Sequence, residues 1–353
     1  MELTAKKRVI IWMKDVHTRY IDGGRMRFLY FTDTHIRGTT PENRKDNFPG
    51  TLKRKLLEIR ELVEQQRVDY VLNGGDWFDR PDVSPAVVRE FAIIINGFTK
   101  PIITIAGNHD IFGQNPESLE RTMLGLIEGI GLVRLLQSGE ELVLEQNGVR
   151  VQITGSSYNY AIDGDGFREY YLIKKRNDVK YAIHLVHGML LNKPFLREVQ
   201  YTRVEEITDT EADITLAGHY HSGFGVVQQE GKYFINPGSI VRISNSLSEM
   251  ERKPKVVILD LMDSIQVTEI ELKSTKPGSE VLDRSKVEAS KNRLVKIHQF
   301  FNGMGNLNYS STDMKKIIEE IAVDQSIEAK VREEAIRRLG EAEEILAVGD
   351  ESG

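Results

Sequence analysis

Short apolar runs alternate with amphipathic segments over the first third of the chain, and this alternation constrains the fold more than any other feature. The apolar runs at 27–33, 69–73 and 101–106 have the length and composition of buried strands. Residues 51–66 and 84–96 lie between them and carry apolar residues at helical spacing. Strands that alternate with helices in this way predict βαβ units and an α/β sheet with covered faces.

The expected helices have their own start signals. Thr51 stands directly before an apolar series that starts at Leu52, and a hydroxyl at this place is typical of a helix N-cap. Ser84 opens the second helix, and we expect a third from about Pro116 to Glu128.

The second half of the chain has mainly the pattern of β-strands. Strands are expected at 141–146, 150–155, 180–187, 213–217, 232–236, 255–261 and 265–272. Residues 274–280 (STKPGSE) have the composition of a linker, and helical patterns follow at 281–302 and 313–346. We therefore expect an N-terminal extension (1–25), a main α/β domain (26–275) and a small C-terminal helical region (276–353).

The composition excludes several classes of protein. Of the 353 residues, 40% are apolar and 28% are charged, which is typical of globular proteins and excludes a disordered or fibrous chain. No run approaches the ~20 apolar residues that cross a bilayer, and the N-terminus lacks a signal-peptide core, so we expect a cytoplasmic protein without membrane attachment. The chain has no cysteine, which excludes disulfides, thiolate zinc sites and iron–sulfur clusters.

The net charge of −6 is concentrated at one end of the chain. Residues 311–353 hold six Lys and Arg against twelve Asp and Glu, and the other 310 residues carry 41 charges of each sign. The negative net charge therefore does not argue against a polyanionic partner.

Polar side chains follow the expected strands at the points where the strands end. They are two aspartates, one asparagine and five of the eight histidines: Asp33, His35, Asp76, Asn108, His109, His187, His219 and His221. In α/β sheets the carboxyl ends of the strands are where ligands bind. Any one of these residues alone would more often cap a turn, but their types and order together favour a shared site.

The donor set indicates a site for two metal ions. Imidazoles and carboxylates bind Mn, Fe or Zn better than Mg, and a central carboxylate, here Asp76, can bridge two ions. Metal pairs ~3.5–4 Å apart recur in enzymes that hydrolyse phosphate esters.

Five motifs carry these residues in a fixed order. They are DTH (33–35), GGDWFD (74–79), GNHD (107–110), HG (187–188) and GHYH (218–221). Together they resemble the five signatures of calcineurin-like metallophosphoesterases. The resemblance covers roughly 26–240 and implies a four-layer α-β-β-α metallophosphoesterase sandwich followed by a small C-terminal helical region.

Within that superfamily, the chain most resembles the nuclease subunit of SbcCD-type double-strand-break repair complexes, including the shorter phage recombination nucleases. The opening MRFLYFTDTHIRG (26–38) and the strand end NPGSIVR (236–242) carry this resemblance, together with the helical tail. The resemblance implies a DNA nuclease, with 3′→5′ exonuclease and single-strand endonuclease activity, that works with an SbcC-type ATPase in DNA repair and recombination. It also implies a homodimer within a heterotetramer, docked to the ATPase by the C-terminal helices.

The resemblance assigns roles residue by residue. Asp33, His35 and His221 bind one divalent metal ion, Asn108, His187 and His219 bind a second, and Asp76 bridges both. Mn²⁺ is the expected metal. His109 is the acid that protonates the leaving oxygen or steadies the phosphate rather than a ligand, and Asp110 orients it.

The chain also departs from the cellular members of this group. They carry a sizeable DNA-capping domain before the docking helices, whereas only 78 residues follow position 275 here. We therefore expect a reduced cap within 276–353.

Other functions and roles remain open at this stage. A small-molecule phosphodiesterase or a phosphatase would share the metals, although protein phosphatases of this superfamily typically show GNHE where this chain has GNHD; a non-enzymatic scaffold is the third alternative. Arg37, Arg44 and Lys45 contact DNA phosphates or form a basic surface loop.

Three more side chains near the motifs have two interpretations each. Tyr158 and Tyr160 stack on bases or pack in the core. His184 should face away from His187 as a core histidine.

Overall fold

The computed structural model describes residues 9–11, 24–196, 198–289 and 328–338. The chain divides into two compact units, Met1–Asp283 and Arg284–Gly353. Most of the expected N-terminal extension and most of the two C-terminal helical segments lie outside the described residues. In the second unit, the described residues include helical stretches at 285–289 and 329–338.

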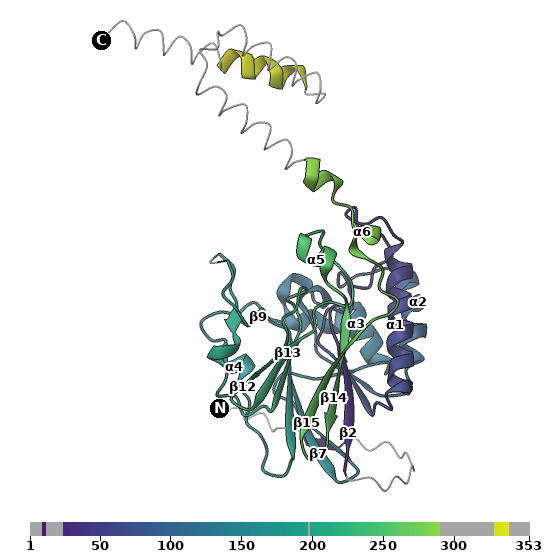
Figure 1. Cartoon of the computed structure of the whole chain (residues 1–353), viewed down its shortest axis with the longest axis vertical. Coiled ribbons are helices and arrows are strands. Elements are labelled where there is room, and N and C mark those ends of the chain that lie inside the picture. The colour runs from purple at the N-terminus through teal and green to yellow at the C-terminus, as the bar shows by residue number, and fades with distance from the viewer. Residues whose placement is uncertain (1–8, 12–23, 197, 290–327, 339–353) are drawn as a thin grey trace, which may run out of the picture. The chain divides into compact units, whose positions relative to one another are not determined.

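Two β-sheets form the centre of the first unit (Figure 1). In the described residues, one sheet has the order β15-β14-β2-β3-β4-β5, with bounds β2 (Met26–Phe31), β3 (Tyr70–Asn73), β4 (Ile102–Thr104), β5 (Arg134–Leu135), β14 (Lys255–Leu261) and β15 (Ile265–Glu271). Strands β2 to β5 run parallel, and β14 pairs antiparallel with both β2 and β15.

The second sheet has the order β1-β6-β7-β8-β11-β13-β12. Its bounds are β1 (Val9–Ile11), β6 (Glu141–Gln146), β7 (Val149–Ser156), β8 (Tyr181–Val186), β11 (Ile214–Ala217), β12 (Gly225–Gln229) and β13 (Lys232–Asn236). Strands β7, β8, β11 and β13 are parallel to one another. A separate short pair joins β9 (Leu190–Leu191) to β10 (Thr202–Arg203).

Three apolar clusters divide the first unit into four layers. One cluster fills the space between the two sheets, with Phe28 and Leu72 from the first and Ile183 and Leu216 from the second. A larger cluster packs the other face of the first sheet against α1 (Phe48–Gln65), α2 (Pro85–Asn96) and α3 (Met123–Gly129). The third lies beneath the short α4 (Arg168–Tyr171) on the outer face of the second sheet. The α-β-β-α sandwich expected from the sequence is confirmed, and its fourth layer is thin (Figure 1).

Two expectations about the helices are wrong in detail. The cap of α1 is Asn47, whose side chain accepts a hydrogen bond from the Gly50 N–H at 2.9 Å, while the Thr51 hydroxyl donates to Asp46. The third helix is broken at Thr122, which separates a 3₁₀ turn (Pro116–Arg121) from α3 and caps the latter through Gly125. The oxygen that accepts from the free N–H groups of the first turn comes from a residue before the expected cap in α1, and from a residue after the expected helix start in α3.

Residues 274–280 do not behave as a free linker. The short α6 (Gly278–Val281) buries Gly278 and Val281, and the N–H of Lys45 donates to the Val281 carbonyl. The first unit thus extends to Asp283, and the division of the remaining chain between cap and docking helices stays a prediction. Among the described helices, none combines the length and apolarity needed to cross a bilayer.

Candidate metal centre

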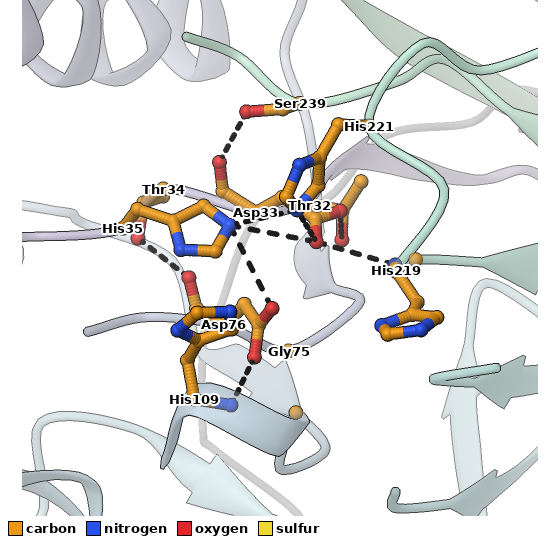
Figure 2. Close-up of polar contacts among 12 residues, drawn as sticks. Thr32, Asp33, Thr34, His35, Gly75, Asp76, His109, His219, His221 and Ser239 are labelled. Carbon is orange, nitrogen blue, oxygen red and sulfur yellow. Dashed lines mark hydrogen bonds and ion pairs between the residues drawn. The ribbon is translucent and has the colours of Figure 1, made fainter. Parts of the chain in front are cut away.

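The candidate site lies where the strands of both sheets end. Asp33 and His35 follow β2, and Asp76 follows β3. Asn108 and His109 open the 3₁₀ turn η1 (Asn108–Asp110) after β4. His187 follows β8, and His219 and His221 follow β11. All eight residues singled out from the sequence are therefore at the same edge of the sandwich. Figure 2 shows Asp33, His35, Asp76, His109, His219 and His221 around one another.

The backbone at this edge is locally strained. Asp33, His35, Asp76 and His219 have positive φ angles of 55°, 47°, 52° and 72°. Non-glycine residues adopt this region at a cost of ~1–3 kcal/mol each, so surrounding contacts must hold them there. The Asp33 N–H donates to the Gly75 carbonyl at 3.1 Å, and the His35 N–H donates to the Asp76 carbonyl at 3.0 Å.

Glycine is required where the third loop approaches Asp76. A Cβ atom on Gly107 would lie 2.0 Å from Asp76 Oδ1 and 2.5 Å from the Asp76 nitrogen. Such an overlap would displace the carboxylate that lies at the centre of the site.

Two groups of side chains in the described residues could each hold a metal ion. The first contains Asp33, His35, Asp76 and His221, whose donor atoms all lie within 4.8 Å of one another. His35 Nε2 is 3.6 Å from Asp76 Oδ2, and His221 Nε2 is 3.6 Å from Asp33 Oδ1. The two imidazoles face each other with their Nε2 atoms 3.0 Å apart.

The second group contains Asp76, His187 and His219, so Asp76 belongs to both. His187 Nε2 lies 3.4 Å from Asp76 Oδ2. The side-chain oxygen of Asn108 adds a fourth donor, at 3.2 Å from His187 Nε2 and 2.9 Å from His219 Nδ1.

The residues present fit a pair of cations. Asp76 Oδ2 is buried without a hydrogen-bond partner, and it is the atom that faces the imidazoles of both groups. An unpartnered buried carboxylate oxygen is costly, and oxygen and imidazole donors around it suit a divalent transition metal.

Three imidazoles of the site are held in the neutral form that binds metal. Burial lowers the pKa of His35 to about 4 and that of His219 to about 3, and it lowers the pKa of His221 well below its usual value. The neighbouring imidazoles strengthen these shifts, because several positive charges cannot share so small a space.

The pKa values of the carboxylates and of His187 depend on a competition between burial and the charges nearby. Burial raises the pKa of Asp33 to about 6. Burial acts in the same direction on Asp76, but the imidazoles of His187 and His35 outweigh it and lower the Asp76 pKa below its ordinary value. Burial alone would lower the pKa of His187, yet the Asp76 carboxylate raises it to about 9. Without a metal, a protonated His187 thus compensates part of the charge on Asp76.

His109 is held differently from the way the resemblance implied. Its ring Nδ1 lies 2.8 Å from the Asp79 carbonyl oxygen and donates to it, and its backbone N–H donates to Asp76 Oδ1 at 2.9 Å. Asp110 instead accepts backbone N–H groups from Gly107 at 2.9 Å and Phe78 at 3.0 Å. The expectation that Asp110 orients the His109 ring is therefore wrong: Asp110 fixes the loop, and the Asp79 carbonyl fixes the ring.

Two of the basic residues after the first motif form ion pairs or hydrogen bonds within the protein. Arg44 is 8% exposed, pairs with Asp46, and donates to the Arg242 carbonyl at 2.7 Å. Arg37 pairs with Asp79 at 3.1 Å. The burial of Arg44 makes it unsuitable as a phosphate contact.

The two tyrosines have different environments. Tyr158 lies beside the site, with its ring centroid 5.5 Å from that of His219 and 6.2 Å from that of His187. Tyr160 is 79% exposed.

One contributor was not singled out by its chemistry in the sequence. The Ser239 hydroxyl donates to the Asp33 carbonyl at 2.7 Å, and the Ser239 N–H donates to the His221 carbonyl at 2.9 Å (Figure 2). The strand-end motif NPGS contains this serine, but nothing in the motif alone shows which loops it joins.

A two-sheet sandwich with carboxylate, amide and imidazole donors at its strand ends defines a metal-dependent phosphoesterase. The family model for calcineurin-like phosphoesterases matches residues 26–223, and the chain belongs to that family.

Similarity to individual proteins is more distant. The chain is 24% identical over 336 residues to the "Double-strand break repair protein MRE11" of Encephalitozoon cuniculi (strain GB-M1). The match covers 85% of this chain and 56% of that relative, so the chain spans little more than half of the relative's length.

Similar solved structures include the calcineurin-like phosphoesterase YfkN from Bacillus subtilis, at 14% identity and a TM-score of 0.44 over 78% of this chain and 99% of that one. GAP50, described as the anchor in the inner membrane complex of Plasmodium, matches at 12% identity and a TM-score of 0.44 over 72% and 86% of the two chains.

The environment of His184 generates a prediction about stability and pH. Its Nε2 donates to the Tyr170 carbonyl at 2.8 Å, its Nδ1 accepts from the Thr154 hydroxyl at 2.9 Å, and burial lowers its pKa to about 4. It packs beneath α4, as a core histidine. Because its pKa in the unfolded chain is ~6.5, the unfolded state binds the extra proton between these values. The neutral His184 therefore makes its full contribution to the free energy of unfolding above pH ~6.5. This contribution is lost as the pH falls toward ~4.

We therefore expect the wild type to lose up to about 3 kcal/mol more stability than His184→Gln between pH 7.5 and pH 4. Urea unfolding of both proteins at several pH values measures this difference. Parallel stability curves for the two proteins would show that His184 is not held neutral by the fold.

Proposed function

We propose that this protein is a two-metal-dependent DNA nuclease, with 3′→5′ exonuclease and single-strand endonuclease activity, that works with an SbcC-type ATPase. The single observation that carries the proposal is the pair of donor groups that share Asp76 in a calcineurin-like phosphoesterase. Two cations that share a carboxylate suit the hydrolysis of phosphate esters, because they can stabilise both the attacking and the leaving oxygen.

Seven side chains would hold the ions. Asp33, His35 and His221 serve one, Asn108, His187 and His219 serve the other, and Asp76 serves both. The mixture of nitrogen and oxygen donors favours Mn²⁺ over Mg²⁺, which prefers an oxygen shell. When bound, the ions would supply Lewis-acid polarisation of the phosphate and a water that is acidic near neutral pH.

His109 is the proposed general acid. Its Nδ1–H donates to the Asp79 carbonyl, so in the imidazolium form the proton on Nε2 is the one free to pass to the leaving oxygen. Its ring packs edge-on against that of His35, at 4.7 Å between centroids, which supports a proton-donor role beside the proposed metal ligands.

DNA is proposed as the substrate on the strength of the distant similarity to a double-strand break repair protein. The same similarity supports a role in repair. The ATPase partner, the homodimer within a heterotetramer and the role in recombination are proposed from the resemblance of the motifs to SbcCD-type nucleases. A cytoplasmic location is part of the same proposal.

The first test compares two phosphodiesters. With Mn²⁺, the full-length protein should shorten end-labelled duplex DNA from its 3′ ends and also hydrolyse bis(p-nitrophenyl) phosphate; EDTA should abolish both activities. Asp76→Asn should lose both, because each donor group loses its shared carboxylate. Hydrolysis of the small ester with intact DNA would instead indicate a small-molecule phosphodiesterase.

The role of His109 gives a second test. His109→Ser should lower the turnover of DNA by ~10²–10⁴-fold while the protein still binds two equivalents of Mn²⁺. His187→Ala is the matched histidine variant and should lose an equivalent of metal. Weakened metal binding by His109→Ser would place His109 among the ligands.

The ATPase partner can be tested on the described part of the C-terminal helices. Val331 is 58% exposed on a helical stretch and is therefore accessible to a partner that docks on these helices. Val331→Glu should weaken capture of an SbcC-type ATPase by at least ~10-fold, since a carboxylate would be buried in the interface. The neighbouring Lys330→Glu is the control, and equal losses in both variants would contradict a specific apolar contact.

A further inference from the structure

The segment that follows β13 has an unusual backbone environment. Residues 239–243 form neither helix nor strand, and Ser239, Ile240 and Val241 are fully buried. Each of the five carbonyl oxygens accepts a hydrogen bond from a side chain: Arg252 donates to Ser239 and Val241, Lys55 to Ile240, Arg44 to Arg242, and Asn43 to Ile243. The carbonyls that a strand or helix would pair internally are thus paired mainly with cations.

Burying these cations is costly. Lys55 is 2% exposed and Arg44 is 8% exposed. Burial lowers the pKa of Lys55 well below its usual value, and the nearby Arg252, Arg242 and Arg44 lower it further. Apolar side chains could fill the same space without this desolvation cost. The hydrogen bonds add something that apolar packing does not, which is a fixed position and orientation for each peptide group.

The other side of the same segment contacts the candidate metal centre. The Ser239 hydroxyl and N–H reach the carbonyls of Asp33 and His221, as described above, and the Ile240 N–H donates to the Thr32 carbonyl at 3.3 Å. Figure 2 shows Ser239 above Asp33, beside His221. Asp33 and His221 belong to the same donor group, together with His35 and Asp76.

The second donor group is oriented mainly by different contacts, although the His219 N–H also donates to Asp33 Oδ1 at 3.2 Å. His187 Nδ1 donates to the Gly74 carbonyl at 2.6 Å, and Asn108 contacts both histidines of that group. A disturbance of residues 239–243 should therefore act unequally on the two groups.

We propose that Lys55, Arg44 and Arg252 are positioning residues of the metal centre: they hold residues 239–243, and through Ser239 they fix Asp33 and His221 for one of the two ions. This inference rests on the proposed two-metal centre. In this proposal, Lys55, Arg44 and Arg252 change the affinity of the site for one ion without contacting that ion. Residues that orient metal ligands typically change metal affinity by ~10–100-fold when they are removed.

The test is a titration of the protein with Mn²⁺ alone. Binding is measured by calorimetry and by the electron paramagnetic resonance signal of free Mn²⁺. The full-length wild type should bind two ions. Lys55→Met removes the donor to Ile240 while keeping the length of the side chain. It should bind one ion ~10–100-fold more weakly and the other within about threefold of the wild-type affinity.

Two further variants separate positioning from general destabilisation. Ser239→Ala removes the hydroxyl that reaches Asp33, is a small change, and should weaken the same ion. Arg27→Met is the matched control, because Arg27 pairs with Asp260 and donates to the Gln66 carbonyl near the start of β2, away from the metal centre. It should lower the denaturation midpoint and leave both Mn²⁺ affinities unchanged.

Wild-type affinities for both ions in Lys55→Met and Ser239→Ala would overturn the inference. The same conclusion would follow if Lys55→Met and Arg27→Met weakened both ions alike. If Lys55→Met does not fold, Ser239→Ala decides the question. Failure of the wild type to bind two ions would overturn the proposed metal centre itself and this inference with it.

Discussion

The structure depends on one buried carboxylate, that of Asp76. Its Oδ2 has no hydrogen-bond partner and faces the Nε2 atoms of His35 and His187. A carboxylate in such a place is stable only if positive charge surrounds it. Without a metal, a protonated His187 supplies part of that charge. Metal ions held by the two donor groups would replace that proton and supply the charge in its place. The loops at this edge, with their positive φ angles and the close approach of Gly107, are arranged so that one oxygen atom can serve both groups.

The two sheets must pack correctly before this centre exists. The loops after the first sheet's strands supply Asp33, His35, Asp76 and Asn108, and those after the second sheet's strands supply His187, His219 and His221. The apolar cluster between the sheets therefore sets the distance between the donors from each side. This dependence explains why the centre is reinforced by several independent contacts, of which the cationic cluster on residues 239–243 is the most elaborate.

Much of this arrangement could be predicted from particular residues. The strands before Asp33, Asp76 and His187 are short apolar runs, and the donors follow them because ligands of α/β sheets bind at the carboxyl ends of the strands. Predictions failed where a side chain had competing partners. Thr51 was expected to cap α1, but Asn47 does so and Thr51 bonds Asp46. Arg44 had the sequence context of a surface loop and is instead buried against backbone carbonyls.

The sequence by itself determined the kinds of donor and the strand ends at which they stand, since hydrophobic periodicity and motif order are local properties of the chain. Only the tertiary structure decided which atoms meet. His35 and His221 are 186 residues apart and lie with their Nε2 atoms 3.0 Å from each other. The Asp79 carbonyl, rather than Asp110, orients His109, and Lys55 reaches a carbonyl 185 residues away. These contacts follow from how two sheets and their loops pack, and no local pattern in the sequence encodes the distance between segments so far apart.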